Sequence, residues 1–121
     1  MLESWYAPAV QQLSNLNRDA LAAFRKGDQD HAAELIQKAQ PISSRLLGVA
    51  QPSLAATEAA SDLDDLYGRM LLSNKHYGWA RLQFQKNVVR WRIWRPQTAE
   101  TERRRKEAEA AIGECDRRMV Q

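Results

Sequence analysis

The chain of 121 residues has one cysteine, five glycines and four prolines. A single cysteine, Cys115, excludes an internal disulfide framework and makes the cytoplasm the expected compartment. The longest apolar runs fall well short of the roughly 18 residues that a transmembrane helix needs, so the sequence predicts none. No basic segment followed by an apolar core opens the chain, and we therefore expect no secretory signal.

Patterns typical of catalysis and of cofactor binding are also missing. His31 and His76 lack the i,i+4 spacing of a helical metal site, and Cys115 has no histidine near it in sequence. Glycine-rich phosphate loops and a nucleophile elbow are absent from the sequence. We therefore expect a protein that is not an enzyme, with no catalytic residue, metal, cofactor or small-molecule substrate.

Apolar residues recur at intervals of three and four along the whole chain, and no strand alternation interrupts them. This periodicity predicts an all-α fold, an up-down antiparallel helical bundle with coiled-coil-type packing, because short connections make neighbouring helices antiparallel. We expect three main helices and a charged fourth. The predicted helices run from about Ser4 to Arg25, from about Asp30 to Val49, from Leu54 to Arg95, and from Thr98 onward.

The expected organisation is one helical domain over residues 1–121. Residues 1–95 would form the bundle core, and residues 97–121 a loosely packed charged helix. The third predicted helix would be about 63 Å long if it were straight. We therefore expect a bend in it, near Gly68, near Ser73–Asn74 or near Gly78.

Charge is divided unevenly within the net value of +3. Residues 1–65 carry five basic and nine acidic side chains, and residues 66–121 carry 13 basic and six acidic ones. Between Leu66 and Arg95 there are seven basic residues, no acidic residue, and six of the nine aromatic residues. This basic, aromatic stretch is the feature that a function has to explain.

A helical wheel of the third predicted helix places its apolar residues on one broad face. Arg81, Arg92 and Arg95 fall on the same side, where an unpaired charge would be costly. We expect acids of the first 65 residues, among them Asp19, Glu34 and Glu58, to pair with them. The predicted core residues of this helix are Leu63, Leu66, Tyr67, Met70, Leu71, Tyr77, Leu82, Phe84, Val88, Val89 and Ile93.

The opposite face of that helix carries large apolar groups among cations, which is typical of a contact surface. Trp79 can stack on Lys75, and Trp94 on Arg90, each at i,i+4 spacing. Two interpretations stay open: a partner protein binds this face, or the fourth helix or a second subunit of a homodimer covers it. The candidate partner-binding residues are Arg69, Leu72, Lys75, His76, Trp79, Lys86, Arg90 and Trp94.

A basic helical nucleic-acid-associated protein is the alternative, because the isoelectric point is about 9.3. Neither a helix-turn-helix nor an aromatic sheet platform is visible, so we do not expect nucleic acid to be the partner. A membrane surface is also not expected. The arginines of VVRWRIWRP point in three separate directions on a wheel and leave no segregated apolar face.

Three segments carry a resemblance to a known family. They are FRKGDQDHAAELI around a glycine-containing turn, SSRLL at Ser43 to Leu47, and DLDDLYGRMLLSNKHYGWARLQF in the third predicted helix. In these segments and in length the chain resembles the flagellar export chaperones of the FliT/FlgN kind. Pro41 and the Trp/Arg-rich end of the third helix depart from the family pattern.

The resemblance implies a cytoplasmic chaperone or adaptor of protein export in the flagellum. It would bind an amphipathic helical segment of an exported subunit, with Leu72, Trp79 and Trp94 as apolar contacts and nearby cations at the rim. In that family the last helix can shield the binding face, which would make residues 97–121 a lid.

Overall fold

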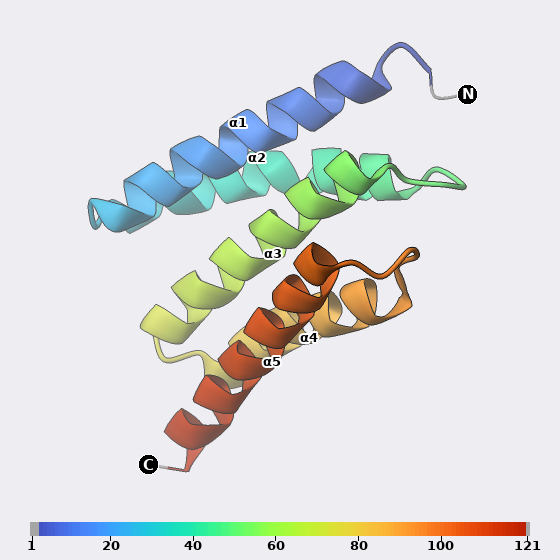
Figure 1. Cartoon of the computed structure of the whole chain (residues 1–121). Helices are drawn as coiled ribbons and strands as arrows, with labels where there is room; N and C mark the ends of the chain where they lie inside the picture. The colour runs from blue at the N-terminus through green and yellow to red at the C-terminus, as the bar shows by residue number, and fades with distance from the viewer. Residues whose placement is uncertain (1–2, 121) are drawn as a thin grey trace. The chain divides into compact units, whose positions relative to one another are not determined.

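The computed structural model describes residues 3–120, which fold into five α-helices and contain no strand (Figure 1). The all-helical class that the periodicity predicts is thereby confirmed. The helices are α1 (Tyr6–Arg25), α2 (Gln29–Leu47), α3 (Leu54–Ser73), α4 (Tyr77–Ile93) and α5 (Ala99–Met119).

The chain divides into two compact units, Met1–Leu63 and Asp64–Gln121. The first contains α1, α2 and the start of α3, and the second contains the rest of α3 with α4 and α5. Our expectation of one domain over residues 1–121 remains a prediction.

In the first unit α1 and α2 lie side by side, joined by a tight turn (Figure 1). Gly27 adopts φ +83° just after α1, a left-handed conformation that glycine reaches without a steric penalty. The Asp28 carboxylate then caps α2 by accepting a hydrogen bond from the backbone N–H of His31 at 3.2 Å. The turn therefore forms where the sequence predicts it.

Polar contacts tie the start of α3 into the first unit. The Tyr6 hydroxyl donates to the Leu46 carbonyl at 3.4 Å and accepts from the Ser53 backbone N–H at 3.0 Å. The Asn17 side-chain amide donates to the Ala59 carbonyl at 2.9 Å. The Tyr6 side chain is buried. Through these hydrogen bonds Tyr6 and Asn17 join α1 to the segment that follows α2.

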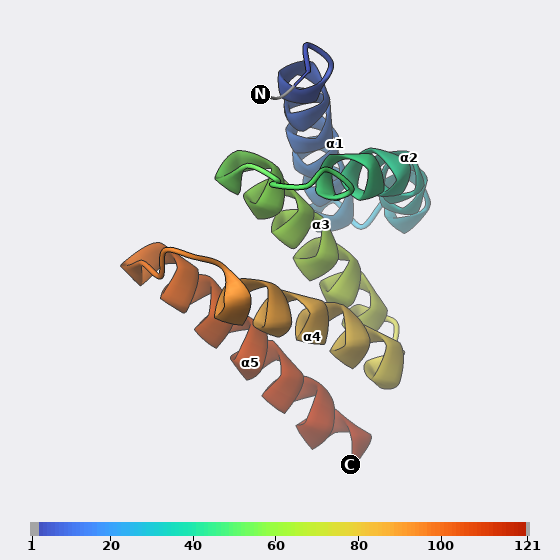
Figure 2. The same ribbon diagram turned by 90° about the vertical axis from the view of Figure 1, so that its right-hand side faces the viewer.

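The third predicted helix is two helices, because the chain turns between Ser73 and Tyr77. Lys75 has φ 66°, and the backbone N–H of His76 donates to the Leu71 carbonyl at 2.8 Å, which satisfies a carbonyl at the end of α3. This break lies at one of the three positions where the sequence predicts a bend. Beyond it α4 runs alongside α5 (Figure 2).

The break also changes which residues of α4 are buried. Leu82, Val89 and Ile93, predicted as core, are exposed, and that prediction is wrong. The wheel assumed one continuous helix, whereas the turn rotates α4 about its axis relative to the end of α3. The buried residues of α4 are Ala80, Gln83, Phe84, Asn87, Val88 and Trp91.

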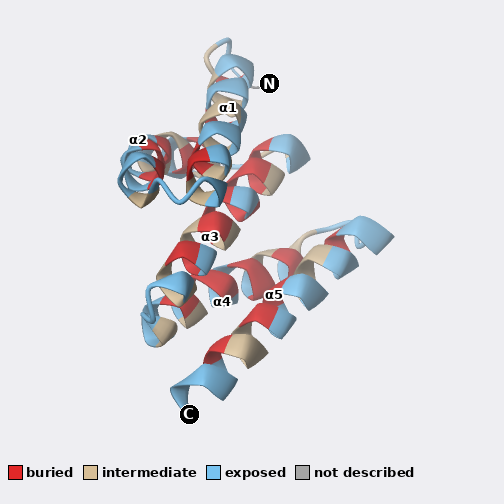
Figure 3. Ribbon diagram, turned by 90° about the vertical axis from the view of Figure 1, so that its left-hand side faces the viewer, coloured by how far each residue is buried: buried red, intermediate tan, exposed pale blue. Residues whose placement is uncertain are grey.

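In the second unit α5 packs against α4 through small side chains. Ala111 and Cys115 of α5 form a buried cluster with Ala80 and Phe84 of α4. Figure 3 shows buried positions recurring along both helices. The C-terminal helix thus contributes to a core, which differs from the loose packing that its charge led us to expect.

The rest of the α5 surface is charged and locally paired. Thr98 and Thr101 form a reciprocal capping box at its start. Lys106 pairs with Glu102 at 3.2 Å, and Arg105 pairs with Glu109, each at i,i+4 spacing.

Candidate partner-binding surface

Four large apolar side chains are exposed along α4. Trp79 is 65% exposed, Leu82 51%, Val89 49% and Ile93 69%. Together with Lys86 they follow one another at spacings of three and four residues, and we call these five residues the α4 stripe. Alternating spacings of three and four are the pattern by which one helix packs along another.

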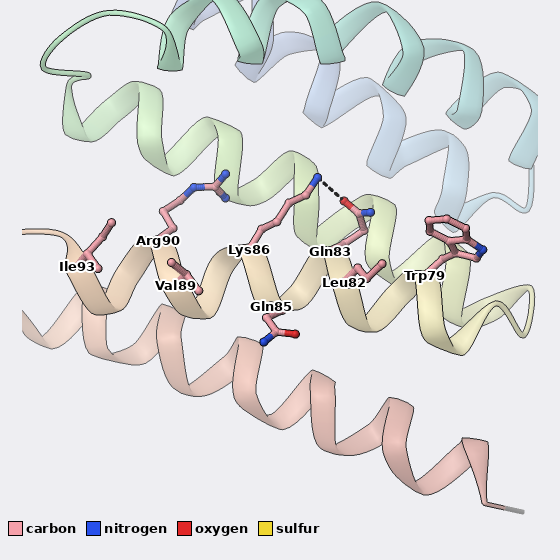
Figure 4. A pocket seen from close by; sticks show the side chains of 8 residues that line it. All are labelled: Trp79, Leu82, Gln83, Gln85, Lys86, Val89, Arg90 and Ile93. Atoms are coloured by element: carbon pink, nitrogen blue, oxygen red, sulfur yellow. Dashed lines mark hydrogen bonds between the residues drawn. The ribbon is translucent and has the colours of Figure 1, made fainter.

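The α4 stripe lines an open groove, shown in Figure 4. All eight residues that line it belong to α4, and the three outside the stripe are Gln83, Gln85 and Arg90. The surface is therefore one face of a single helix, with its orientation set by the packing of the opposite face into the core of the second unit.

A buried ion pair lies at one margin of the groove. An Arg90 Nη atom donates to Asp64 Oδ2 at 2.9 Å, and the side chains of the two residues are only 15% and 9% exposed. Arg90 also donates to the side chain of Asn87. Because its guanidinium is used inside the second unit, Arg90 acts as a structural residue between α3 and α4.

Most of the basic residues in residues 64–120 have a carboxylate partner within this unit. Arg69 pairs with Asp65 at 2.9 Å. Arg81 pairs with Asp116 at 2.9 Å, an acid of α5, whereas the sequence suggested an acid of the first 65 residues for it. Among the described residues, we find no carboxylate partner for four cations of the second unit. They are Lys75, Lys86, Arg92 and Arg95.

The structure places two of the eight predicted binding residues, Trp79 and Lys86, in the α4 stripe. Lys75 and His76 are exposed in the turn that precedes α4. Leu72 is partly buried against the cluster of Phe84 and Cys115 and so belongs mainly to the core.

The remaining three predicted residues are engaged within the second unit. Arg69 lies over the ring of Phe84, 5.7 Å from its centroid, in addition to its bond with Asp65. Trp94 lies edge-on to Trp91 with ring centroids 6.2 Å apart, in place of the expected stack on Arg90. These groups shape the second unit more than they offer a free surface.

Sequence reasoning missed Leu82, Val89 and Ile93 as surface residues. The signal that finds them is the spacing counted from Trp79, because Leu82, Lys86, Val89 and Ile93 continue it without interruption. To count from Trp79, one has to know that a new helix begins near it. The sequence does not mark the start of α4 with a proline or a strong capping residue.

Other chemistry is limited in the part of the chain that the structure describes. No group of three or more His, Cys, Asp or Glu side chains in residues 3–120 could hold a metal ion. Cys115 is fully buried, and burial raises the pKa of its thiol above the ordinary value. None of the described helices is both long enough and apolar enough to cross a membrane.

Comparison of the chain with protein-family models, with curated proteins and with solved structures finds no match. The surface itself, and the resemblance noted in the sequence, are therefore the grounds on which a function can be argued.

Proposed function

We propose that this protein is a non-catalytic protein-binding module that takes an amphipathic helix of a partner protein along the α4 stripe. The observation that carries the proposal is the row of four exposed apolar side chains at helix-pairing spacing. Large apolar side chains gathered on one exposed face are typical of interaction sites.

A helix is the partner element that such a stripe fits best. Spacings of three and four repeat along one line of a helix, and the matching line on a second helix interlocks with it. From Trp79 to Ile93 the stripe extends about 21 Å, so it matches about four turns of a partner helix. Recognition of this kind is a helix lying along an apolar face with charged margins.

The expected affinity is moderate. Covering the exposed half of each apolar side chain contributes about 1 kcal/mol, and the partner helix contributes a similar amount from its own side. The sum is about 8 kcal/mol before the entropy lost on association is subtracted. An affinity of about 1 μM is therefore the upper limit that these contacts provide, and the entropy lost on association weakens it toward the millimolar range. Weak, reversible binding of this kind suits a chaperone or adaptor that releases its partner.

The resemblance to flagellar export chaperones is consistent with this role and suggests a cytoplasmic setting and an exported flagellar subunit as the partner. A lid formed by residues 97–121 is not part of the proposal. Ala111 and Cys115 of α5 fill the cluster around Phe84, so their removal would expose a core.

Nucleic acid remains the alternative partner. The basic isoelectric point favours it, but the ion pairs of the second unit argue against it. Most of the basic residues of the second unit are neutralised by carboxylates, which leaves few cations available for phosphate contacts. Titration with single- and double-stranded oligonucleotides at two salt concentrations tests it, and tight, salt-dependent binding would favour this alternative.

The proposal is tested with a fluorescein-labelled helical peptide that presents leucines at spacings of three and four. We expect anisotropy to report binding to the wild-type protein and about tenfold weaker binding to Leu82→Ser, which removes one apolar contact. Leu54→Ser is the matched control, because Leu54 is also an exposed leucine, 44% accessible, and lies at the start of α3.

Both variants should keep the circular dichroism spectrum of the wild type, since both side chains are exposed. No binding to the wild type at millimolar peptide, or equal weakening by the two substitutions, would contradict the proposal.

A further inference from the structure

Lys86 occupies the centre of the α4 stripe, with Leu82 and Trp79 on one side and Val89 and Ile93 on the other. Its ammonium group donates to the side-chain oxygen of Gln83 at 3.0 Å, an uncharged acceptor (Figure 4). No carboxylate within residues 3–120 pairs with it. A cation is thus held among apolar groups on the face that a partner would cover.

The neighbouring charges do not compensate Lys86. Residues 66–95 contain no acidic side chain at all. The one buried carboxylate beside the groove, Asp64, is already bound to Arg90. Neutralisation of Lys86 in a complex therefore has to come from the partner.

A second copy of this chain is a poor occupant of the stripe. Two α4 helices that pair along it in an antiparallel manner about its centre place Lys86 opposite Lys86 of the other copy. A parallel pair in register does the same. Like charges face each other in both arrangements, where covering the stripe removes water that would otherwise screen them.

We propose that the occupant of the α4 stripe is an amphipathic helix with an acidic residue at the position facing Lys86 and apolar residues on either side of it. This inference rests on the proposed function and specifies the chemistry of the partner. A carboxylate accepts a charge-assisted hydrogen bond from the ammonium group and replaces the water lost on docking. An apolar residue at the same position leaves the ammonium group without a partner, which disfavours that helix.

The lysine also sets the register of the complex. A single polar position within an apolar stripe selects the alignment in which its partner group is opposite. A shift by one heptad would place the acidic residue against Trp79 or Ile93, where it gains no salt bridge and loses its hydration.

The test uses the full chain and two helical peptides with the same apolar residues, one with Glu and one with Gln at the central position. We expect the Glu peptide to bind about five- to tenfold more tightly at low salt and the difference to shrink at high salt. A third peptide with Lys at this position should bind most weakly.

Charge reversal at Lys86 should invert the preference. The Lys86→Glu variant is expected to bind the Lys peptide more tightly than the Glu peptide. Arg92→Glu is the matched control, because Arg92 is another exposed cation of α4 without a carboxylate partner among the described residues and it does not line the groove. This control should leave the ranking of the peptides unchanged.

The outcomes separate the inference from the proposed function. Binding of none of the peptides would overturn the proposed function. Equal binding of all three peptides, or a ranking that Lys86→Glu leaves unchanged, would overturn the inference while helix docking itself is retained. A concentration-dependent dimer in sedimentation that Leu82→Ser abolishes would make a second copy the occupant and would also overturn it.

Discussion

Replacement of Gly68 in α3 by alanine should destabilise the folded protein, although alanine itself favours a helix. A Cβ atom added there would lie 2.7 Å from Cε1 and 2.8 Å from Cζ of Phe84. Phe84 is fully buried, so its ring has little room to move away. Alanine gains about 0.5–1 kcal/mol over glycine in a helix interior, but overpacking of this kind costs about 1–3 kcal/mol. We therefore expect Gly68→Ala to lower the free energy of unfolding by about 0.5–2 kcal/mol.

Gly113 in α5 is the matched control for Gly68. Its nearest neighbour to an added Cβ is an Nη atom of Arg117 at 3.4 Å, an exposed side chain that can move. Gly113→Ala should therefore raise the free energy of unfolding by about 0.5–1 kcal/mol. Both glycines lie in Asp64–Gln121, so urea unfolding followed by circular dichroism compares them in the same unit. Stabilisation by both substitutions would refute the close contact of Gly68 with Phe84.

Three further predictions concern charge and burial. Asp64→Ala leaves the Arg90 guanidinium largely buried without its carboxylate, so it should lower the free energy of unfolding in urea by about 3 kcal/mol. Asp64→Leu combined with Arg90→Met removes both charges and should lower it much less. Equal losses would argue against a buried ion pair. The hydrogen bond from Arg103 holds the pKa of Glu100 below its ordinary 4.5, so this bond stabilises the fold above that pH and is lost as the pH falls through the lowered pKa. Thermal melts between pH 7 and pH 2 should then show a smaller acid destabilisation in Glu100→Gln, and an unchanged pH dependence would count against the bond. Cys115 should react with a thiol reagent far more slowly in the native protein than in guanidinium chloride, since its thiol is buried; similar rates would contradict that burial.

Local signals in the sequence predict much of the fold. Gly27 and Asp28 mark the turn between α1 and α2 because one tolerates a left-handed backbone and the other caps a helix. The pair Ser73–Asn74 is one of three positions where a bend was expected, and α3 ends there. Such signals act within a few residues, so they can be read without knowledge of the tertiary packing.

The face of α4 could not be predicted in the same way. The direction of a helix face after a turn depends on the backbone angles within that turn, and Lys75 adopts φ 66° without a glycine to indicate it. Burial of polar residues adds to the difficulty. Gln83 and Asn87 are buried in α4 and accept hydrogen bonds from Lys86 and Arg90, while Leu82 remains exposed. Periodicity of apolar residues alone therefore assigns Phe84 and Val88 to the core correctly but places Leu82, Val89 and Ile93 there wrongly.

The charge pairing expected for Arg81, Arg92 and Arg95 is wrong: Arg81 pairs with an acid outside the first 65 residues, and no carboxylate among the described residues pairs with Arg92 or Arg95. Asp19 binds the neighbouring Arg18 at 3.1 Å, and Glu34 binds Lys38 at 3.5 Å. Arg81 instead finds Asp116 on α5. Charge totals show that opposite charges are available, but the packing of the helices decides which of them meet.

The central claim is that a partner helix lies along the α4 stripe, and the indole N–H signals of the four tryptophans test it most directly. The measurement is a ¹⁵N–¹H correlation spectrum of the full chain, titrated with the Glu-containing peptide and assigned through Trp→Phe variants. We predict that the signal of Trp79, in the stripe, shifts progressively and saturates, while that of Trp5, next to α1, does not move. A shift of Trp5 with no change at Trp79 would contradict the account, as would a saturating interaction that moves neither.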